Sequence, residues 1–230
     1  MRPQNLPLRV QEVRDRVARA ARAAGRSAQS VTLLAVGKAQ PLELVVAVAG
    51  SGVTDFGENY LREGLERIAA LQDAGLTWHF IGRIQSNKTR PIAEHFAWVH
   101  ALDRLNVAER LSAQRPFHAP PLNVCLQVNL AAESSKGGVA PAELPALAAA
   151  VARLPRLKLR GLMCIPPEET ELSRQRAWFA ALRALKQSLD ASGMALDTLS
   201  MGMSGDFEAA IQEGATIVRL GTALFGSRPQ

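Results

Sequence analysis

One lysine stands where a reactive amine is expected. Lys38 directly follows residues 31–37, a short and nearly continuous apolar run of the kind that forms a strand buried on both faces. In a parallel barrel this lysine lies at the carboxyl end of a strand, where barrel active sites are found. A lysine partly removed from water there acts as a nucleophile toward a carbonyl group. The alternative is a lysine whose apolar stem lets its charge reach water.

A polar, glycine-rich segment at residues 200–206 predicts a phosphate site. The loops after the seventh and eighth strands of a barrel often hold phosphate, and backbone N–H groups at the start of a helix favour such an anion. Ser200 and Ser204 fall in the first loop, and Gly221 and Thr222 follow the eighth strand. The alternative for the first loop is a helix cap made by Ser204 or Asp206.

Arg219 lies within the apolar segment 216–221, where a charge needs a partner if it points into the barrel. The alternative is a surface ion pair. A guanidinium facing a pyridine nitrogen would keep that nitrogen unprotonated, because arginine does not give up its proton. An unprotonated ring is a poor electron sink. An imine-forming lysine and a phosphate site together suggest a phosphorylated aldehyde as the ligand.

Strand and helix patterns alternate along the whole chain. Strands are expected at residues 31–38, 53–56, 78–82, 98–103, 122–130, 157–165, 198–203 and 216–226. Each of the first seven is followed by a helical pattern, and another helix is expected at residues 8–24. This order predicts an α/β fold, a single (β/α)8 TIM-type barrel with an extra N-terminal helix. A doubly wound sheet would instead open with a G-x-G-x-x-G turn, which the segment VGKAQP lacks. We expect one domain over residues 1–230, with residues 1–30 packing on the barrel.

The composition excludes several function classes. The chain has 230 residues and a formal charge of +6, with five lysines and 22 arginines that are interleaved with acidic residues, unlike a nucleic-acid footprint. No stretch has the length of a signal peptide or membrane span, so a soluble, cytoplasmic protein is expected. Cys125 and Cys164 are expected to be reduced thiols. The four histidines show no metal-ligand spacing, and we expect no metal site.

Several segments resemble one family. They are LLAVGK (33–38), FGENY (56–60), WHFIG (78–82), IQSNK (84–88), RGLM (160–163), LSMGMSGD (199–206) and VRLGTALFG (218–226), together with VNL (128–130), Glu133, Lys136 and Gly138. In this order they resemble the pyridoxal phosphate homeostasis proteins, from about residue 8 to Arg228. The resemblance implies a barrel of the alanine racemase N-terminal type that carries pyridoxal phosphate (PLP) as a Schiff base on Lys38.

The resemblance also implies roles for other positions. Arg219 matches the residue that faces the pyridine nitrogen, and Asn59 matches a residue near the ring. Ser200, Ser204, Gly221 and Thr222 match phosphate-loop positions. His79 is similar to a family histidine that points into the barrel, although it can equally be a core imidazole.

Two positions depart from the family pattern. Gly37 stands where the family usually has serine, and Arg83 replaces more usual residues beside the expected mouth of the barrel.

The resemblance favours a carrier over an enzyme. Alanine racemases take their second base, a tyrosine, from a further domain of a partner subunit, whereas the one tyrosine here is Tyr60. We expect a non-catalytic protein of intracellular vitamin B6 homeostasis that delivers PLP, contacts apo PLP-dependent enzymes transiently and is a monomer. Lys136 is a candidate for PLP release or a solvated charge. The alternatives are a weak PLP-dependent amino-acid racemase and a basic partner-binding module on a barrel scaffold.

Overall fold

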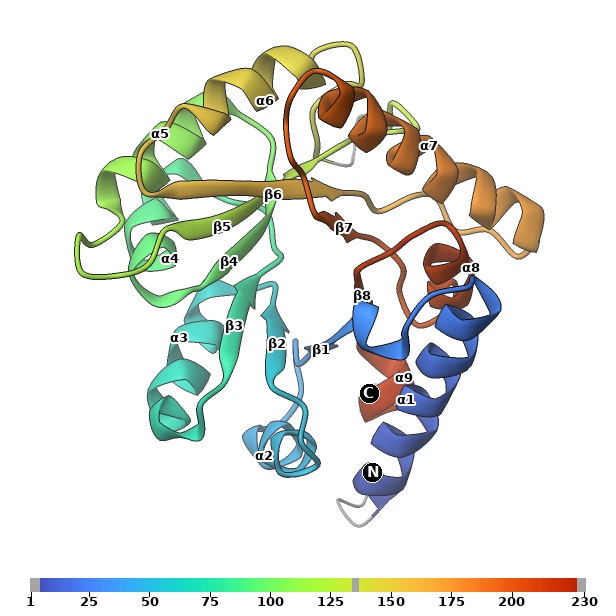
Figure 1. The fold of residues 1–230 in the computed structure, drawn as a ribbon. Coiled ribbons are helices and arrows are strands. Elements are labelled where there is room, and N and C mark those ends of the chain that lie inside the picture. The colour runs from blue at the N-terminus through green and yellow to red at the C-terminus, as the bar shows by residue number, and fades with distance from the viewer. Residues whose placement is uncertain (1–4, 134–136, 227–230) are drawn as a thin grey trace.

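The computed structural model describes residues 5–133 and 137–226. Its eight parallel strands form one closed barrel in the order β1 to β8, with the helices around the outside (Figure 1). The strands are β1 (Thr32–Val36), β2 (Asp55–Glu58), β3 (Thr77–Phe80), β4 (Trp98–Leu102), β5 (Leu122–Gln127), β6 (Leu157–Met163), β7 (Thr198–Ser200) and β8 (Ile217–Leu220). The predicted eight-stranded barrel is therefore confirmed.

Helices separate consecutive strands, as parallel pairing requires. They are α1 (Leu6–Ala23), α2 (Leu42–Gly50), α3 (Leu61–Ala70), α4 (Thr89–His95), α5 (Leu105–Gln114), α6 (Leu144–Ala152), α7 (Leu172–Ala191), α8 (Phe207–Gln212) and α9 (Thr222–Phe225). Three short 3₁₀ turns occur at η2 (Ala28–Ser30), η3 (Gln72–Ala74) and η4 (Ser86–Lys88). Within the described ranges, no helix is long and apolar enough to cross a membrane.

Two elements differ from the sequence expectation. The second strand lies further along the chain, at Asp55–Glu58, because its charged ends resemble a loop in sequence although Glu58 is fully buried. The apolar segment 216–226 is not one strand, since β8 ends at Leu220 and a short helix, α9, begins at Thr222. Gly221 lies at this change of direction.

Helix α1 packs on the outside of the barrel against α8 and α9, so the first and last described elements lie side by side (Figure 1). Its buried face carries residues with the period of an amphipathic helix, namely Leu6, Val10, Val13, Val17, Ala20 and Ala21. On its rim the Arg16 guanidinium stacks over the Phe207 ring, 4.7 Å from its centroid, and its Nε lies 2.9 Å from the Glu208 carboxylate. Apolar burial and these contacts hold α1 to the barrel wall.

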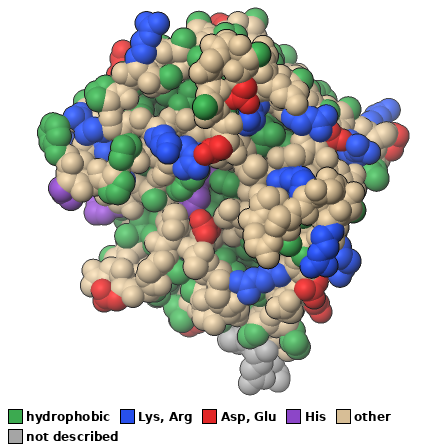
Figure 2. Space-filling view, viewed as in Figure 1, with side chains coloured by type: hydrophobic (Ala, Val, Ile, Leu, Met, Phe, Trp, Pro, Cys, Tyr) green, Lys and Arg blue, Asp and Glu red, His purple; other side chains and the backbone are tan. Residues whose placement is uncertain are grey.

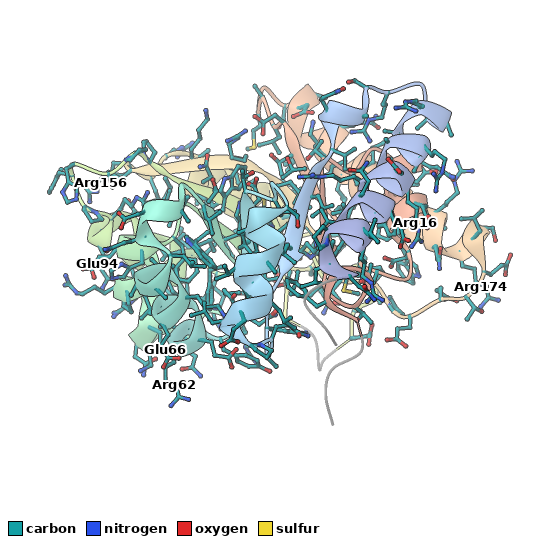
Figure 3. All side chains as sticks on the ribbon, turned by 90° about the horizontal axis from the view of Figure 1, so that it is seen from below. Arg16, Arg62, Glu66, Glu94, Arg156 and Arg174 are labelled. Atoms are coloured by element: carbon teal, nitrogen blue, oxygen red, sulfur yellow. The ribbon has the colours of Figure 1, made fainter. Side chains whose placement is uncertain are left out.

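On the face in view, basic and acidic side chains are interspersed and form no continuous basic patch (Figure 2). Several arginines and glutamates on the outer helices project away from the barrel, among them Arg62, Glu66, Glu94 and Arg174 (Figure 3). Their ion pairs are exposed, for example Arg62 with Glu66 at 3.6 Å, and such pairs contribute about 0–1 kcal/mol each. The barrel is held instead by its apolar core and strand ladder.

Candidate functional site

Lys38 lies in the turn that follows β1, at the carboxyl end of the barrel. It is half-buried, between the buried Gly37 and the exposed Ala39. The Gln40 N–H donates to the Gly37 carbonyl at 3.0 Å, which closes a tight turn, and Ala39 takes a φ of 57°, a left-handed conformation that is uncommon for a residue with a side chain. The backbone on both sides of Lys38 is therefore fixed.

A buried ion pair between Arg67 and Glu58 holds this turn in place. Arg67 of α3 donates to the Glu58 carboxylate at 2.5 Å through Nη1 and to the Gln40 carbonyl at 2.7 Å through Nη2. The Ala39 N–H donates to Glu63 Oε2 at 3.2 Å. Helix α3 thus holds the backbone that carries Lys38 through charge-assisted hydrogen bonds, which are stronger than neutral ones.

Glu58 is fully buried, and burial raises its pKa to about 7 against the opposing attraction of Arg67. Its Oε2 atom accepts no hydrogen bond from the described residues. Because the pKa of 4.5 rises on folding, this carboxyl favours the folded state most below pH 4.5, and that contribution is lost as the pH rises through 7.

Gly37 lies against this carboxylate, which gives the first prediction. A Cβ at position 37 would lie 3.1 Å from Glu58 Oε1, and Gly37 does not have a positive φ. Gly37→Ser therefore places a hydroxyl donor beside Glu58 after a small shift of that side chain. We expect Gly37→Ser to be more stable than Gly37→Ala by about 1.5–3 kcal/mol at about pH 8, the size of a hydrogen bond to a charged group. Denaturant unfolding of both variants measures this difference, and equal stabilities would contradict it.

Arg219 points into the barrel from β8 and is 5% exposed. Its Nη1 donates to the Ser200 carbonyl at 2.7 Å and to Ser200 Oγ at 2.9 Å, and its Nη2 donates to the Cys164 carbonyl at 2.9 Å. Burial lowers its pKa from the ordinary value, but a guanidinium keeps its proton in proteins. In the strand register Arg219 pairs with Leu34 of β1, so Arg219 and Lys38 come from adjacent strands.

The loops after β7 and β8 meet at the carboxyl end of β1. The Ala223 N–H of α9 donates to Ser204 Oγ at 3.0 Å. A Cβ at Gly221 would lie 3.5 Å from the Val36 carbonyl, which places this loop at the end of β1. Gly202 has a φ of 94°, and a Cβ there would lie only 2.6 Å from Ala210, so this position requires glycine. Ser204, Gly221 and Thr222 therefore lie in two loops that contact each other at the end of β1, the strand that precedes Lys38.

Neither Ser204 nor Asp206 caps helix α8 through a side-chain hydrogen bond, which was the alternative for the first loop. Asp206 occupies the N-cap position of α8, but its side chain makes no capping hydrogen bond there. It accepts instead from the Met203 N–H within the loop, at 2.6 Å. Ser204 binds the other loop, as described above. Ser200 lies apart from these groups, because its hydroxyl is fully buried inside the barrel with Arg219.

Asn59 lies just beyond β2, the strand that pairs with β1. Its Oδ1 atom is buried and has no hydrogen-bond partner among the described residues. Asn59 and Arg83 both line two cavities at the mouth of the barrel, of about 230 Å³ and 490 Å³. Arg83 is exposed, so its departure from the family pattern places a cation at the entrance. Lys136 lies outside the described residues.

Sequence reasoning missed the contacts among buried polar side chains behind Arg219. His100 Nδ1 lies 2.7 Å from Ser200 Oγ, and His100 Nε2 lies 2.9 Å from His79 Nδ1. His79 and His100 each occupy the interior of an apolar strand, and a polar residue in such a strand is the signal that could have pointed to them. His79 is thus buried and hydrogen-bonded.

Comparisons with known proteins agree with this architecture. The family described as alanine racemase, N-terminal domain, matches residues 9–229. The pyridoxal phosphate homeostasis protein of Pseudomonas aeruginosa is 59% identical over 219 residues, covering 95% of this chain and 94% of that protein. The protein of the same name from Escherichia coli K12 is 50% identical over 220 residues, with 94% of each chain covered.

Solved structures of PipY from Synechococcus elongatus have the same fold. The structure without PLP has a TM-score of 0.86 at 36% identity and covers 96% of this chain and all of that one. The structure with PLP bound has a TM-score of 0.81 at 37% identity and covers 91% of this chain and all of that one. With an alanine racemase N-terminal domain along its length and these relatives at 50–59% identity, this chain belongs to the family of pyridoxal phosphate homeostasis proteins.

Proposed function

We propose that this protein binds pyridoxal phosphate through Lys38 as a Schiff base and acts as a non-catalytic carrier in intracellular vitamin B6 homeostasis. The observation that carries this proposal is the convergence of Lys38, the buried Arg219 and the paired loops of Ser204 and Gly221 on adjacent strands. The PLP-bound structure of PipY supports it.

The residues fit this ligand. Pyridoxal phosphate supplies an aldehyde that a lysine amine can hold and a ring that acts as an electron sink when its nitrogen is protonated. Arg219 offers a buried guanidinium to the ring nitrogen. Asn59, whose buried Oδ1 has no hydrogen-bond partner among the described residues, follows β2 at the carboxyl end of the barrel. Ser204, Gly221 and Thr222 offer hydroxyl and backbone groups to the phosphate.

The same residues favour binding over turnover. Arg219 keeps a facing ring nitrogen unprotonated, because it is itself a permanent donor. Racemisation needs acid and base groups on opposite faces of the substrate carbon. The one tyrosine of the chain, Tyr60, is 57% exposed beside the mouth, which is not the buried, oriented position of a second base. A weak racemase is the alternative, and turnover of D- or L-alanine would favour it.

Delivery to other proteins completes the proposal. The cofactor would leave Lys38 by exchange with water or another amine and pass to apo PLP-dependent enzymes through transient contacts. We propose that the protein does so in the cytoplasm as a monomer without binding nucleic acid. The mixture of basic and acidic side chains on the visible face supports the last point (Figure 2).

The proposal is tested by the visible spectrum of the protein mixed with PLP, before and after borohydride, followed by peptide mass mapping. One reduced adduct on Lys38 is expected. An adduct spread over Lys88, Lys136, Lys158 and Lys186, or no adduct, would overturn the proposed site. Alanine turnover measured on the same preparation separates the carrier from the racemase.

A further inference from the structure

A row of hydrogen-bonded side chains crosses the interior of the barrel. It begins at Asp55 of β2, continues through His79 of β3 and His100 of β4, and reaches Ser200 of β7 and Arg219 of β8. The distances are 3.1 Å from Asp55 Oδ1 to His79 Nε2, 2.9 Å between the two histidines, 2.7 Å from His100 Nδ1 to Ser200 Oγ, and 2.9 Å from Ser200 Oγ to Arg219 Nη1. We call these five residues the polar column.

The Asp55 carboxylate fixes the direction of every hydrogen bond, because it can only accept and so requires a proton on His79 Nε2. At the other end, the Ser200 oxygen accepts from the Arg219 guanidinium, which leaves the hydroxyl proton of Ser200 available to His100 Nδ1. His100 then carries its proton on Nε2 and donates to His79 Nδ1. His79 in turn carries its proton on Nε2 and donates to the Asp55 carboxylate. All four bonds point from Arg219 to Asp55.

The opposite order fails at the carboxylate. If each histidine carried its proton on Nδ1, His79 Nε2 would present a lone pair to Asp55 Oδ1. Partial burial alone would raise the pKa of Asp55, but hydrogen bonds from His79 and Thr54 outweigh it and the pKa lies below its ordinary value, so the group is ionised. Burial lowers the pKa of His79 and, more strongly, that of His100, so neither ring takes up a second proton. Two neutral histidines with Nε2–H are the one consistent arrangement.

The polar column runs from a buried end at Arg219 to a partly exposed end at Asp55. Among the described residues, no ion pair with a carboxylate is formed by Arg219, although the more distant Asp206 favours its charge. Asp55 is 24% exposed and lines a cavity of about 510 Å³ at the opposite end of the barrel, next to Thr32 and Thr54. The aligned hydrogen bonds turn their acceptor ends toward Arg219 and polarise one another in this low-dielectric interior. The partly exposed Asp55 carboxylate thus stabilises the buried Arg219 guanidinium through the polar column.

We propose that Asp55, His79 and His100 are positioning residues for Arg219: the column locks the Ser200 hydroxyl as an acceptor and fixes the orientation in which Arg219 presents its remaining donors to the ligand ring. The inference rests on the proposed function for the ligand, but the orientation of Arg219 is a property of the protein alone. Without the column, the Ser200 hydroxyl can rotate and the guanidinium loses a fixed acceptor.

The first test uses the ligand-free protein. Nitrogen NMR of isotope-labelled protein should show neutral Nε2–H forms for both His79 and His100, and side-chain N–H signals of Arg219 that exchange slowly because the guanidinium is held. His79→Phe keeps a ring stacked on Trp98, where the centroids lie 5.4 Å apart, and should broaden the Arg219 signals. Asp55→Asn keeps the size and an acceptor oxygen but removes the charge, so it provides a variant with little risk of misfolding. His95→Phe, at an exposed histidine, is the control.

The second test adds PLP. His79→Phe and His100→Phe should weaken PLP binding by about tenfold, the lower end of what loss of an outer hydrogen-bond partner costs at a metal site. They should also shift the pH dependence of the bound ligand's absorbance, whereas His95→Phe should change neither property. Asp55→Asn should shift the same absorbance in the same direction, but less.

The outcomes separate this inference from the proposed function. Slow Arg219 exchange that is lost in the column variants supports the column even if PLP is trapped on other lysines, and in that case only the proposed function fails. An Nδ1–H form of either histidine, or Arg219 signals unchanged in both His79→Phe and Asp55→Asn, overturns the column. PLP bound to Lys38 with wild-type affinity and absorbance in the column variants also overturns it and leaves the proposed function intact.

Discussion

The Lys38→Ala protein is expected to lose the visible absorbance that the wild type acquires with PLP, and borohydride should trap no adduct on it. Alanine removes the Nζ atom that we propose holds the aldehyde, and among the described residues no other lysine lies in the turn after β1. The loops that we propose bind the phosphate, and Arg219, remain, so we expect weak binding to persist. We expect the affinity to fall by about 100-fold or more, which corresponds to about 3 kcal/mol.

A matched control distinguishes the site from general lysine chemistry. Lys158→Ala removes an exposed lysine from β6 and should leave both the absorbance and the affinity unchanged. Titration of each protein with PLP, followed by absorbance and by equilibrium dialysis, gives the two quantities separately. An adduct of wild-type yield on Lys38→Ala would show that the aldehyde is held elsewhere.

Arg67→Met should cause the largest loss of stability. Arg67 is 9% exposed and neutralises the fully buried Glu58, and removal of one partner of a buried pair costs about 3–5 kcal/mol because it leaves an uncompensated charge. The loss should be greatest at about pH 8 and smaller at about pH 5. Without Arg67, nothing opposes the rise of the Glu58 pKa caused by burial, so Glu58 takes up a proton at the lower pH and its charge no longer needs a partner.

Two further variants identify the cause. Arg62→Met changes an exposed arginine of the same helix, whose side chain points into solvent (Figure 3), and should change stability by less than about 0.5 kcal/mol. The double variant Glu58→Met with Arg67→Met removes both charges and should recover most of the loss. Denaturant unfolding at the two pH values measures the stability of the wild type and of the three variants. A loss from Arg67→Met that does not depend on pH would contradict this account of Glu58.

Arg67→Met also links stability to the site, because Arg67 donates to the Gln40 carbonyl in the turn that carries Lys38. Weaker PLP binding should therefore accompany the loss of stability.

The barrel could be predicted because its strands are short apolar runs separated by amphipathic helices. Parallel strands buried on both faces have this pattern, and it gave their order without any long-range information. Strand β2 lies further along the chain than predicted, because its charged ends do not fit the pattern of an apolar run. Its buried Glu58 is compensated by Arg67 on the next helix, a pairing that the local pattern does not reveal. The loops after β7 and β8 were predictable because the barrel fold places them together.

The polar column could not be predicted in this way. Asp55, His79, His100 and Ser200 are separated by 21 to 100 residues, and only the strand register brings them into one line. A single histidine in an apolar strand indicates a buried imidazole but does not name its partner. Ser200 illustrates the difference. Its place at the start of a loop that can bind phosphate could be predicted from the sequence, whereas the orientation of its side chain into the barrel could not.

The two cysteines have a consequence for the redox behaviour of this barrel. Cys125 and Cys164 are free and buried, and burial raises the pKa of each thiol to about 12. Oxidants and electrophiles react with thiolates, which are scarce here at neutral pH. Although the Cys164 carbonyl binds Arg219 at 2.9 Å, its sulfur stays protonated. We therefore expect both sulfurs of the folded barrel to react slowly with peroxide, so that the backbone contact between Cys164 and Arg219 is retained under oxidising conditions.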